Sequence, residues 1–200
     1  MARNTGPKNK LSRREGVNLT GTMSRSLERR MNVPPGGSKM RPRKATDYAL
    51  GLRAKQRVKR QYGMTERQFL RFFGEAQKLP GPPGGNLLQL LERRLDNTVY
   101  RLGFARTRPM ARQLVSHRHI SVNDQVVNIP SYMVKPGDVI RLSETAAQIP
   151  YVQDELETGR TRLPSWLSRD RAVGRVTGVP QREDVDPDIR EDLIVEFYAR

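Results

Sequence analysis

The chain has 200 residues, a formal net charge of +16 and no cysteine. This length allows one large domain or two small ones with a buried core, although 36% hydrophobic and 6% aromatic residues make that core lean. Without cysteine, disulfides and thiolate metal sites are excluded. No apolar run approaches the length of a membrane-spanning helix, and the first residues lack the apolar core of a signal peptide, so we expect an intracellular protein.

The charge is distributed unevenly along the chain. Residues 1–60 contain 17 Lys and Arg against 3 Asp and Glu, residues 61–144 contain 12 against 7, and residues 145–200 contain 8 against 11. Self-repulsion of this size destabilises a compact chain, so the first two regions predict a polyanionic partner. An anionic membrane would also neutralise them, but no strongly apolar helix face accompanies the basic residues. We expect neither a membrane nor a small-molecule partner.

Residues 1–44 are basic, rich in Gly, Pro, Ser and Asn, and without sustained periodicity. This composition predicts little order in the free protein. A solvated tail is one interpretation, and a segment that RNA orders is the other. In the second interpretation the phosphate-binding candidates are Arg3, Lys8, Lys10, Arg13 and Arg14.

A helix is predicted from Thr46 or Asp47 to about Gln61, with only a narrow apolar stripe at Leu50, Ala54 and Val58. Cations occupy much of its remaining surface, which is costly unless RNA surrounds the helix. These RNA-binding candidates are Arg53, Lys55, Arg57, Lys59 and Arg60.

The next helix begins with a capping box at Thr65 and Gln68. Its phenylalanines share one broad side, so we predict that they form core and do not stack on bases. Arg67 and Arg71 lie on a narrow arc away from that side and are further RNA-binding candidates. Residues 79–85, rich in Pro and Gly, then form a connector.

A third helix is predicted from Asn86 to Leu102, ended by Gly103. Its apolar residues fall within about a third of the helical wheel, which is therefore the buried side. Polar residues fall together on another arc at spacings of three, four and seven, and we expect them to contact RNA. They are Arg93, Arg94, Asn97 and Arg101.

A fourth helix should start after the N-cap Thr107, with Pro109 tolerated in its first turn. Arg108, Arg112 and Ser116 form a row along it, and Arg106 precedes it. Short extended runs follow at residues 119–122, 125–129 and 139–142, separated by turns at residues 123–124 and 135–138. Cations stacked at helical spacing with amides and hydroxyls fit an RNA backbone, although ordinary basic helices are common.

His117 and His119 are the only histidines. A metal pair is one interpretation of the H-x-H spacing, but no third ligand candidate is signalled nearby. We therefore predict RNA contact for both, with simple exposure as the alternative, and no metal, cofactor or catalytic residue. No hydrolase, metalloprotease or dinucleotide signature is present.

The last quarter of the chain is less regular. Trp166 and Leu167 are predicted to make an anchoring apolar contact, residues 172–179 a strand, and residues 193–198 a closing strand or docked apolar tail. Residues 183–192 are acidic but have no paired histidine or nucleophile, so we predict that they face solvent or a basic protein neighbour. The protein-contact candidates are Glu183, Asp184, Asp186 and Asp188.

The run RRLDNTVYRLGFARTRPMARQLVSHRHISVN, followed by VNIPSYMVKPGDVI, closely resembles the RNA-binding module of the small-ribosomal-subunit protein S-four family of bacterial type. The runs TGPKNKLSRREG and KQRVKRQYGMTERQF extend the resemblance. It implies an α+β protein in which a helical domain, formed by the N-terminal part and the C-terminal tail, receives an inserted module of helices on a small, mostly antiparallel sheet. The expected parts are a basic extension ordered by RNA (1–44), a helical domain (45–91), an α+β RNA-binding domain (92–182, core module 92–154) and a returning tail (183–200).

The resemblance also implies direct binding of small-subunit rRNA, nucleation of the subunit body, and a role in translational accuracy through contact with the neighbouring protein S-five. Further implied partners are protein S-twelve and mRNA, including, in some members, the protein's own message. The implied location is the cytoplasmic ribosome, with an organelle ribosome left open. Some relatives carry a metal-binding cysteine cluster, but this chain has Asn9, Ser12 and Ser26 at what correspond to those positions, so no metal is expected.

Two other classes of function remain open from the sequence. One is a stand-alone RNA-binding regulator or stress factor that carries the same module. The other is an RNA-modifying enzyme, which would need an additional catalytic domain. Only about fifty residues follow the module, and the preceding half shows no active-site motif.

Overall fold

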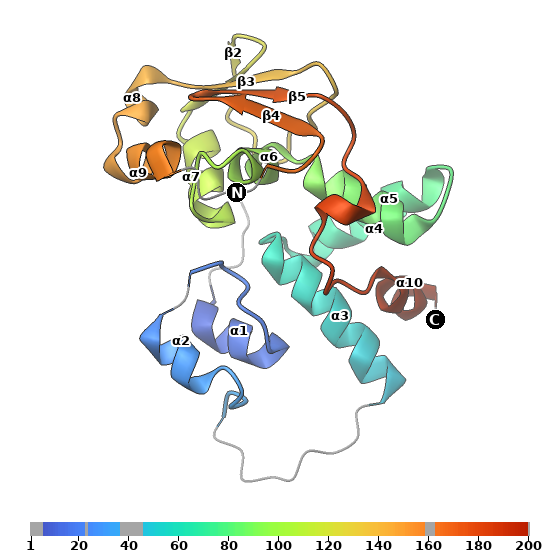
Figure 1. Cartoon of the computed structure of the whole chain (residues 1–200). Coiled ribbons are helices and arrows are strands. Elements are labelled where there is room, and N and C mark those ends of the chain that lie inside the picture. The colour runs from blue at the N-terminus through green and yellow to red at the C-terminus, as the bar shows by residue number, and fades with distance from the viewer. Residues whose placement is uncertain (1–5, 23, 37–45, 159–162, 200) are drawn as a thin grey trace. The chain divides into compact units, whose positions relative to one another are not determined.

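The computed structural model describes residues 6–22, 24–36, 46–158 and 163–199. The chain divides into two compact units, which we call unit 1 (Met1–Gly85 with Pro187–Arg200) and unit 2 (Asn86–Asp186). Figure 1 shows helices in unit 1 and helices with a sheet in unit 2, which confirms the predicted α+β class. Within the described ranges, none of the helices has both the length and the apolar character needed to cross a membrane.

Unit 1 contains the two helices predicted most clearly from the sequence. Helix α3 (Asp47–Gln61) starts at Thr46, whose side chain accepts a hydrogen bond from the Ala49 amide, and α4 (Glu66–Lys78) carries the predicted capping box at Thr65. The phenylalanines of α4 are buried, so their assignment to the core is confirmed. Their exposed fractions are 0% for Phe69, 2% for Phe72 and 3% for Phe73.

The N-terminal region contains more structure than its composition predicts. Helices α1 (Lys8–Glu15) and α2 (Arg25–Arg30) form there, so the expectation of little order is wrong for these segments. Local polar bonds stabilise them: the Ser24 side chain caps α2, and the Arg13 guanidinium donates to the backbone oxygens of Val33 and Pro34. Hydrogen bonds between side chain and backbone do not require apolar residues at helical spacing, so the sequence pattern did not indicate these helices.

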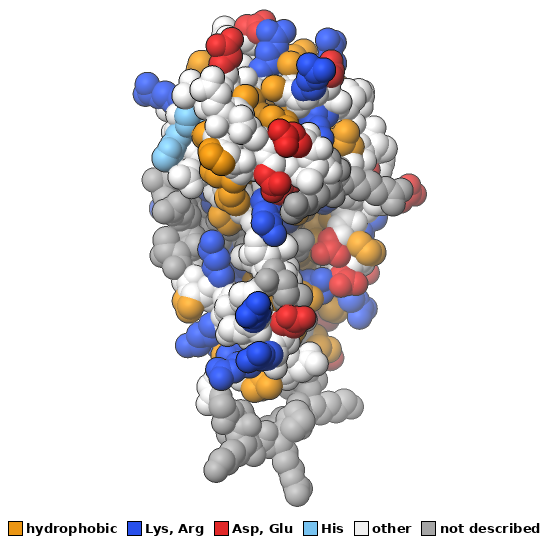
Figure 2. Space-filling model, turned by 60° about the vertical axis from the view of Figure 1, so that its left-hand side comes forward, with side chains coloured by type: hydrophobic (Ala, Val, Ile, Leu, Met, Phe, Trp, Pro, Cys, Tyr) orange, Lys and Arg blue, Asp and Glu red, His pale blue; other side chains and the backbone are white. Residues whose placement is uncertain are grey.

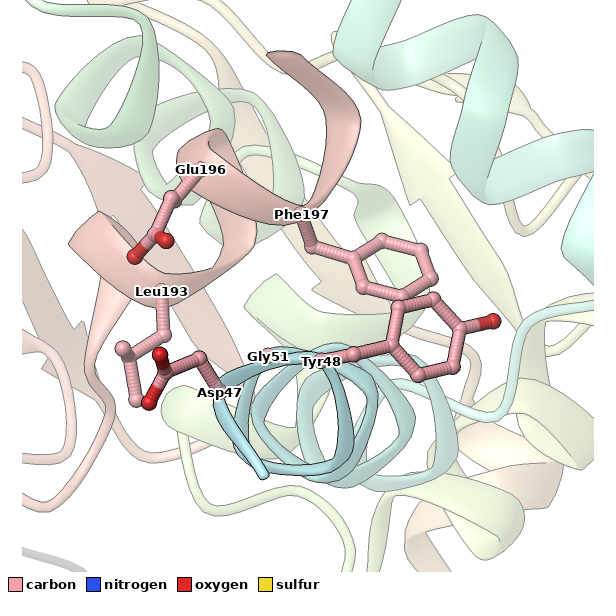
Figure 3. A pocket seen from close by; sticks show the side chains of 6 residues that line it. All are labelled: Asp47, Tyr48, Gly51, Leu193, Glu196 and Phe197. Atoms are coloured by element: carbon pink, nitrogen blue, oxygen red, sulfur yellow. The ribbon is translucent and has the colours of Figure 1, made fainter. Parts of the chain in front are cut away.

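The C-terminal run Leu193–Tyr198 is helical and forms part of α10 (Glu191–Ala199), so the strand alternative is wrong and the docked-tail alternative is right. Ile194 is fully buried, and the ring of Phe197 lies 5.3 Å from that of Tyr48 on α3. A Cβ on Gly51 would lie only 3.1 Å from the Leu193 oxygen. The glycine therefore lets α3 and α10 approach closely (Figure 3).

Unit 2 contains a five-stranded antiparallel sheet of order β2-β1-β3-β5-β4. Asn123 and Asp124, both at positive φ, form the tight turn between β1 and β2. The strand predicted within residues 172–179 is confirmed as β5, whereas β4 was not predicted. The strands are β1 (Ile120–Val122), β2 (Gln125–Val126), β3 (Val139–Leu142), β4 (Leu167–Asp170) and β5 (Val173–Val176).

Helices α6 (Leu95–Arg101) and α7 (Arg108–Ser116) lie against one face of this sheet (Figure 1). Their apolar sides meet the sheet in one core, where Trp166 is 2% exposed, which confirms its anchoring role. Thr107 caps α7 as predicted, through a bond from the Met110 amide. Helices α8 (Glu144–Ala147) and α9 (Pro150–Thr158) and the 3₁₀ turn η1 (Arg182–Asp184) complete the unit.

The single helix predicted from Asn86 to Leu102 is wrong, because the chain breaks between α5 (Pro83–Glu92) and α6. Arg94 adopts extended geometry and forms a bridge with Met133. The Leu95 amide donates to the Tyr132 oxygen over 2.8 Å. These backbone bonds to a distant segment replace helical bonds, and the polar side of α6 turns inward.

Candidate nucleic-acid interface

Two buried carboxylates lie at the centre of the predicted RNA-binding face of unit 2. Glu92 is 0% exposed and ends α5, and Asp96 is 4% exposed in the first turn of α6. A carboxylate removed from water is costly unless it is paired and hydrogen-bonded. Both carboxylates have such partners, and these are arginines that the sequence assigned to RNA.

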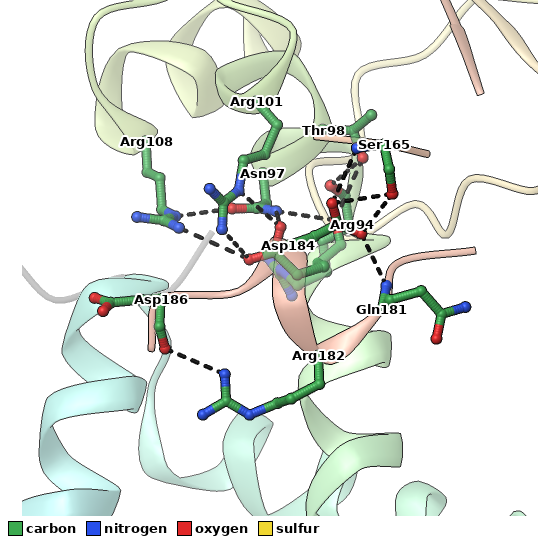
Figure 4. A network of polar contacts seen from close by, with 11 residues as sticks. Arg94, Asn97, Thr98, Arg101, Arg108, Ser165, Gln181, Arg182, Asp184 and Asp186 are labelled. Atoms are coloured by element: carbon green, nitrogen blue, oxygen red, sulfur yellow. Dashed lines mark hydrogen bonds and ion pairs between the residues drawn. The ribbon is translucent and has the colours of Figure 1, made fainter. Parts of the chain in front are cut away.

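Glu92 holds side chains from α6 and α7. The Arg101 guanidinium donates from Nη2 to Oε1 over 2.8 Å and from Nε to Oε2 over 2.9 Å. Asn97 Nδ2 donates to the same Oε2 over 2.8 Å, and Asn97 Oδ1 accepts from Arg108 Nε over 2.8 Å. Arg108 Nη2 also lies 3.9 Å from Glu92 Oε1. Figure 4 shows Arg101, Asn97 and Arg108 converging from two helices.

Asp96 holds the second pair of arginines. Arg94 donates to both of its oxygens, over 3.1 and 2.9 Å, in the fork geometry that guanidinium and carboxylate share. Arg112 donates from Nε and Nη2 to Oδ2, over 2.8 and 2.5 Å. Arg112 on α7 is thereby fixed to the start of α6.

We call Arg94, Arg101, Arg108 and Arg112 the arginine cluster. Four guanidiniums share two carboxylates, so the cluster keeps an excess of two positive charges. The side chains of Arg101, Arg108 and Arg112 are 20%, 15% and 11% exposed, while that of Arg94 is 3% exposed. Three of the four therefore present fixed positive charge at the surface, an arrangement suited to phosphate.

The predicted exposed arc of the third helix is therefore only partly right. Arg94 and Asn97 are each 2% exposed and act inside the protein, contrary to the arrangement expected from the helical wheel. Arg93 is half-buried and donates to the Val134 oxygen over 3.0 Å. The guanidinium of Arg108 lies over the ring of Tyr100, 4.6 Å from its centroid, a contact that also fixes its orientation.

The remaining candidates of unit 2 lie at the two ends of α7. Arg106 is exposed before its start, and Ser116 and His117 are exposed at its end. His119 is half-buried, with Nδ1 3.4 Å from the Ser143 hydroxyl, and its ring lies 6.3 Å from that of His117. Figure 2 shows the histidine side chains, in pale blue, at the surface.

The cations of α3 in unit 1 are paired with acids of the same unit. Glu15 accepts from Arg53 and Arg60, and Glu66 accepts from Lys55 and Lys59. Arg57 donates to Asp188 over 3.1 Å. The expectation that this helix is costly unless RNA surrounds it is therefore too strong, because three carboxylates offset part of its charge.

Burial affects the titration of two of these groups in opposite ways. Burial lowers the pKa of Arg60, and the carboxylate of Glu15 opposes that change. Burial raises the pKa of Glu66, but the hydrogen bonds and charges of Lys55 and Lys59 outweigh it, and the pKa lies below the usual glutamate value. Lys55 is only 6% exposed, with Nζ 4.6 Å from the ring centroid of Phe197, so it supports the docking of α10.

The other cations of unit 1 are placed unevenly. Lys8, Lys10 and Arg14 are exposed, whereas Arg13 is occupied by the backbone oxygens described above. Arg67 and Arg71 are exposed and line an open hollow on α4 with Thr65, Gln68 and Leu70. Arg3 lies outside the described residues.

The acidic segment is partly used inside the protein. Asp184 accepts from the backbone and hydroxyl of Ser165 and from the Gln181 amide, and the Asp186 backbone oxygen accepts from Arg182. Glu183 is exposed. Within the ranges that the structure describes, there is no cluster of three or more His, Asp or Glu side chains suited to holding a metal ion.

Glu92, Asp96 and Tyr100 also belong to this face, and no sequence pattern had assigned them to it. A signal was present, because Glu92 and Asp96 are four residues apart and precede Arg101 and Arg112 by nine and sixteen. Within one continuous helix this spacing predicts a solvated acidic pair. Only the break between α5 and α6 turns both carboxylates inward.

The comparisons with known proteins agree along the whole chain. A family model described as "S4 domain" matches residues 93–140, and one described as "Ribosomal protein S4/S9 N-terminal domain" matches residues 3–92. Proteins called "Small ribosomal subunit protein uS4" from Herpetosiphon aurantiacus, Hahella chejuensis and Thermoanaerobacter sp. are 51%, 48% and 47% identical to this chain. In each pair the match covers 100% of both chains. The chain therefore belongs to the family of small ribosomal subunit protein uS4.

Proposed function

We propose that this chain is a structural component of the small ribosomal subunit, where it binds rRNA directly without catalysing a reaction. The observation that carries the proposal is the arginine cluster, which holds an excess of two positive charges in fixed geometry at the surface of unit 2. Fixed guanidiniums recognise phosphates at defined distances from one another, so they suit a folded RNA junction. The full-length match to proteins with a ribosomal name supports the same role.

The mechanism is the fixing of RNA helices relative to one another. Contacts with the phosphate backbone position a protein on RNA and carry little sequence information. Cations on both units would bind phosphates of different rRNA helices and favour one mutual orientation, onto which later proteins assemble. For these contacts we propose Arg101, Arg106, Arg108 and Arg112 of unit 2, and Lys8 and Arg67 of unit 1.

We also propose that the acidic segment contacts a neighbouring ribosomal protein. Glu183 and Asp188 are exposed, and Asp184 is half-buried; Asp184 and Asp188 also have bonding partners within their own units. From the family resemblance we further propose contacts with S-five or S-twelve and an effect on translational accuracy. As the location we propose the small ribosomal subunit in the cytoplasm of a bacterium.

Reconstitution of the small subunit from its rRNA and purified proteins tests the proposal. This protein should join naked rRNA before other proteins are added, and particles assembled without it should sediment more slowly. A stand-alone RNA-binding regulator, the alternative function, would bind messages or finished subunits and would not change assembly.

A further inference from the structure

We infer that Glu92 and Asp96 are positioning residues for RNA recognition: the two buried carboxylates fix the guanidiniums of Arg101, Arg108 and Arg112 in the orientation that distinguishes structured rRNA from other RNA. The inference rests on the proposed function and deepens it. It assigns the selectivity of the face to two negative charges, which repel RNA on their own.

The carboxylate of Glu92 fixes the orientation of two arginines. Its carboxylate accepts from both Nε and Nη2 of Arg101, so the guanidinium plane has a fixed orientation. Its Oε2 also holds Asn97, whose own oxygen accepts from Arg108 Nε. One carboxylate, that of a fully buried residue, therefore sets the direction of two arginines on different helices (Figure 4).

Asp96 anchors a third arginine independently of Glu92. Arg94 is 2% exposed and donates two hydrogen bonds to Asp96, so the pair forms a rigid support. Arg112 then donates two bonds to Oδ2 of that carboxylate. An arginine side chain has several rotatable bonds and in water samples many orientations, so such anchoring removes an entropic cost from RNA binding.

The charge of the two carboxylates distinguishes an effect of orientation from an effect of net charge. Neutralising either carboxylate raises the net charge of the face by one, so long-range attraction alone predicts tighter binding to every RNA. Loss of orientation predicts weaker binding to the RNA whose phosphates match the cluster, and unchanged binding to unmatched RNA. The two accounts therefore differ in the sign of the effect on specific binding.

The test measures binding of the full chain to in vitro transcribed small-subunit rRNA and, separately, to tRNA, at one salt concentration. In Glu92→Gln an amide nitrogen, which cannot accept, replaces one carboxylate oxygen. Arg101 then loses one of its two bonds in either orientation of the amide, and Asn97 also loses its bond when the nitrogen takes the place of Oε2. We expect rRNA affinity to fall by about tenfold, the effect of misaligning one charge-assisted hydrogen bond, while tRNA affinity is unchanged or rises. Glu157→Gln on α9, an exposed site in the same unit with the same charge change, should leave the ratio of the two affinities at the wild-type value.

Arg112→Lys provides a second variant that does not change a buried residue. Lysine keeps the charge but cannot reproduce two N–H bonds in the planar fork of arginine. We expect the preference for rRNA to fall by about tenfold with the salt dependence of binding unchanged. If Glu92→Gln does not fold, as judged by circular dichroism and melting, this variant decides.

The inference is overturned if Glu92→Gln binds rRNA as tightly as, or more tightly than, the wild type, or if folded Arg112→Lys keeps the full preference. Failure of the proposed function looks different. In that case the wild-type protein itself would bind rRNA and tRNA equally well.

Discussion

The guanidinium of Arg101 donates two parallel hydrogen bonds to the carboxylate of Glu92, of 2.8 and 2.9 Å, although the two residues end different helices. The pair spans the break in the chain at residues 93–94. The geometry of the arginine cluster thus depends on a local backbone feature, which backbone bonds from residues 130–134 maintain.

Removal of arginines from the cluster should weaken rRNA binding because fewer phosphates are neutralised. For Arg108→Ala with Arg112→Ala we expect lower affinity and a salt dependence reduced by about one unit for each phosphate that the variant no longer binds. Filter binding across a salt series measures both quantities. Arg141→Ala, which removes an exposed arginine of β3 paired with Asp124, is the control. An unchanged slope in the double variant would remove both residues from the interface.

A methyl group at Gly174 should destabilise unit 2. The Cβ of Gly174→Ala would overlap the Leu102 side chain, which is fully buried between α6 and the sheet. Overpacking of this kind costs about 1–3 kcal/mol in the free energy of unfolding. Hydrogen exchange of the β3 and β5 amides should show the loss.

Gly74→Ala is the matched control for that variant. Gly74 lies in α4, and a Cβ there would meet no atom within 4 Å. Because alanine favours helix over glycine, we expect a gain of up to about 1 kcal/mol. Equal effects of the two substitutions would contradict the packing described for Gly174.

The stability of unit 1 should fall in mild acid because of Glu66. The pKa of Glu66 is lowered in the folded state, so its contribution is fully present above the unfolded pKa of about 4.3 and is lost as the pH falls through the folded value. Its side chain is 46% exposed, so screening by water limits the effect to under about 1 kcal/mol. Melting from pH 6 to pH 3 measures it, and Glu66→Gln should show a shallower decline. An equally steep decline would assign the acid sensitivity to other carboxylates.

The docking of α10 should weaken when the Tyr198 hydroxyl is removed. This hydroxyl donates to Glu66 Oε1 over 3.2 Å, and burial, followed by the charge and hydrogen bond of Glu66, raises the pKa of Tyr198 above its usual value. Tyr198→Phe should cost about 0.5–1 kcal/mol while the ring contact with Phe73, at 4.5 Å, remains. Limited proteolysis near residues 187–199 detects the weaker docking. No change in cleavage would indicate that the apolar contacts suffice.

Elements with regular periodicity or clear caps were predictable from the sequence. Helices α3, α4 and α7 follow from capping residues and an apolar side, and the turn at Asn123 and Asp124 follows from residues that tolerate positive φ. Helix α10 was ambiguous because its run of β-branched and aromatic residues also suits a strand. Contacts with α3 decide the outcome, and local preference cannot reveal them.

The candidate site was predictable in its cations and not in its geometry. The helical wheel grouped Arg94 and Asn97 with Arg101, but the break before Leu95 buries the first two and leaves the side chain of the third 20% exposed. That break depends on hydrogen bonds to residues almost forty positions later, such as Leu95 to Tyr132. The positioning role of Glu92 is invisible for the same reason.

Chemical footprinting of naked small-subunit rRNA with this protein alone, across a salt series and with excess tRNA as competitor, tests the central claim most directly. We predict discrete protection at one junction of several rRNA helices, which persists in the presence of tRNA. Diffuse protection that tRNA abolishes would contradict the account, because the positive charge would then act without the selectivity that a fixed arginine cluster provides.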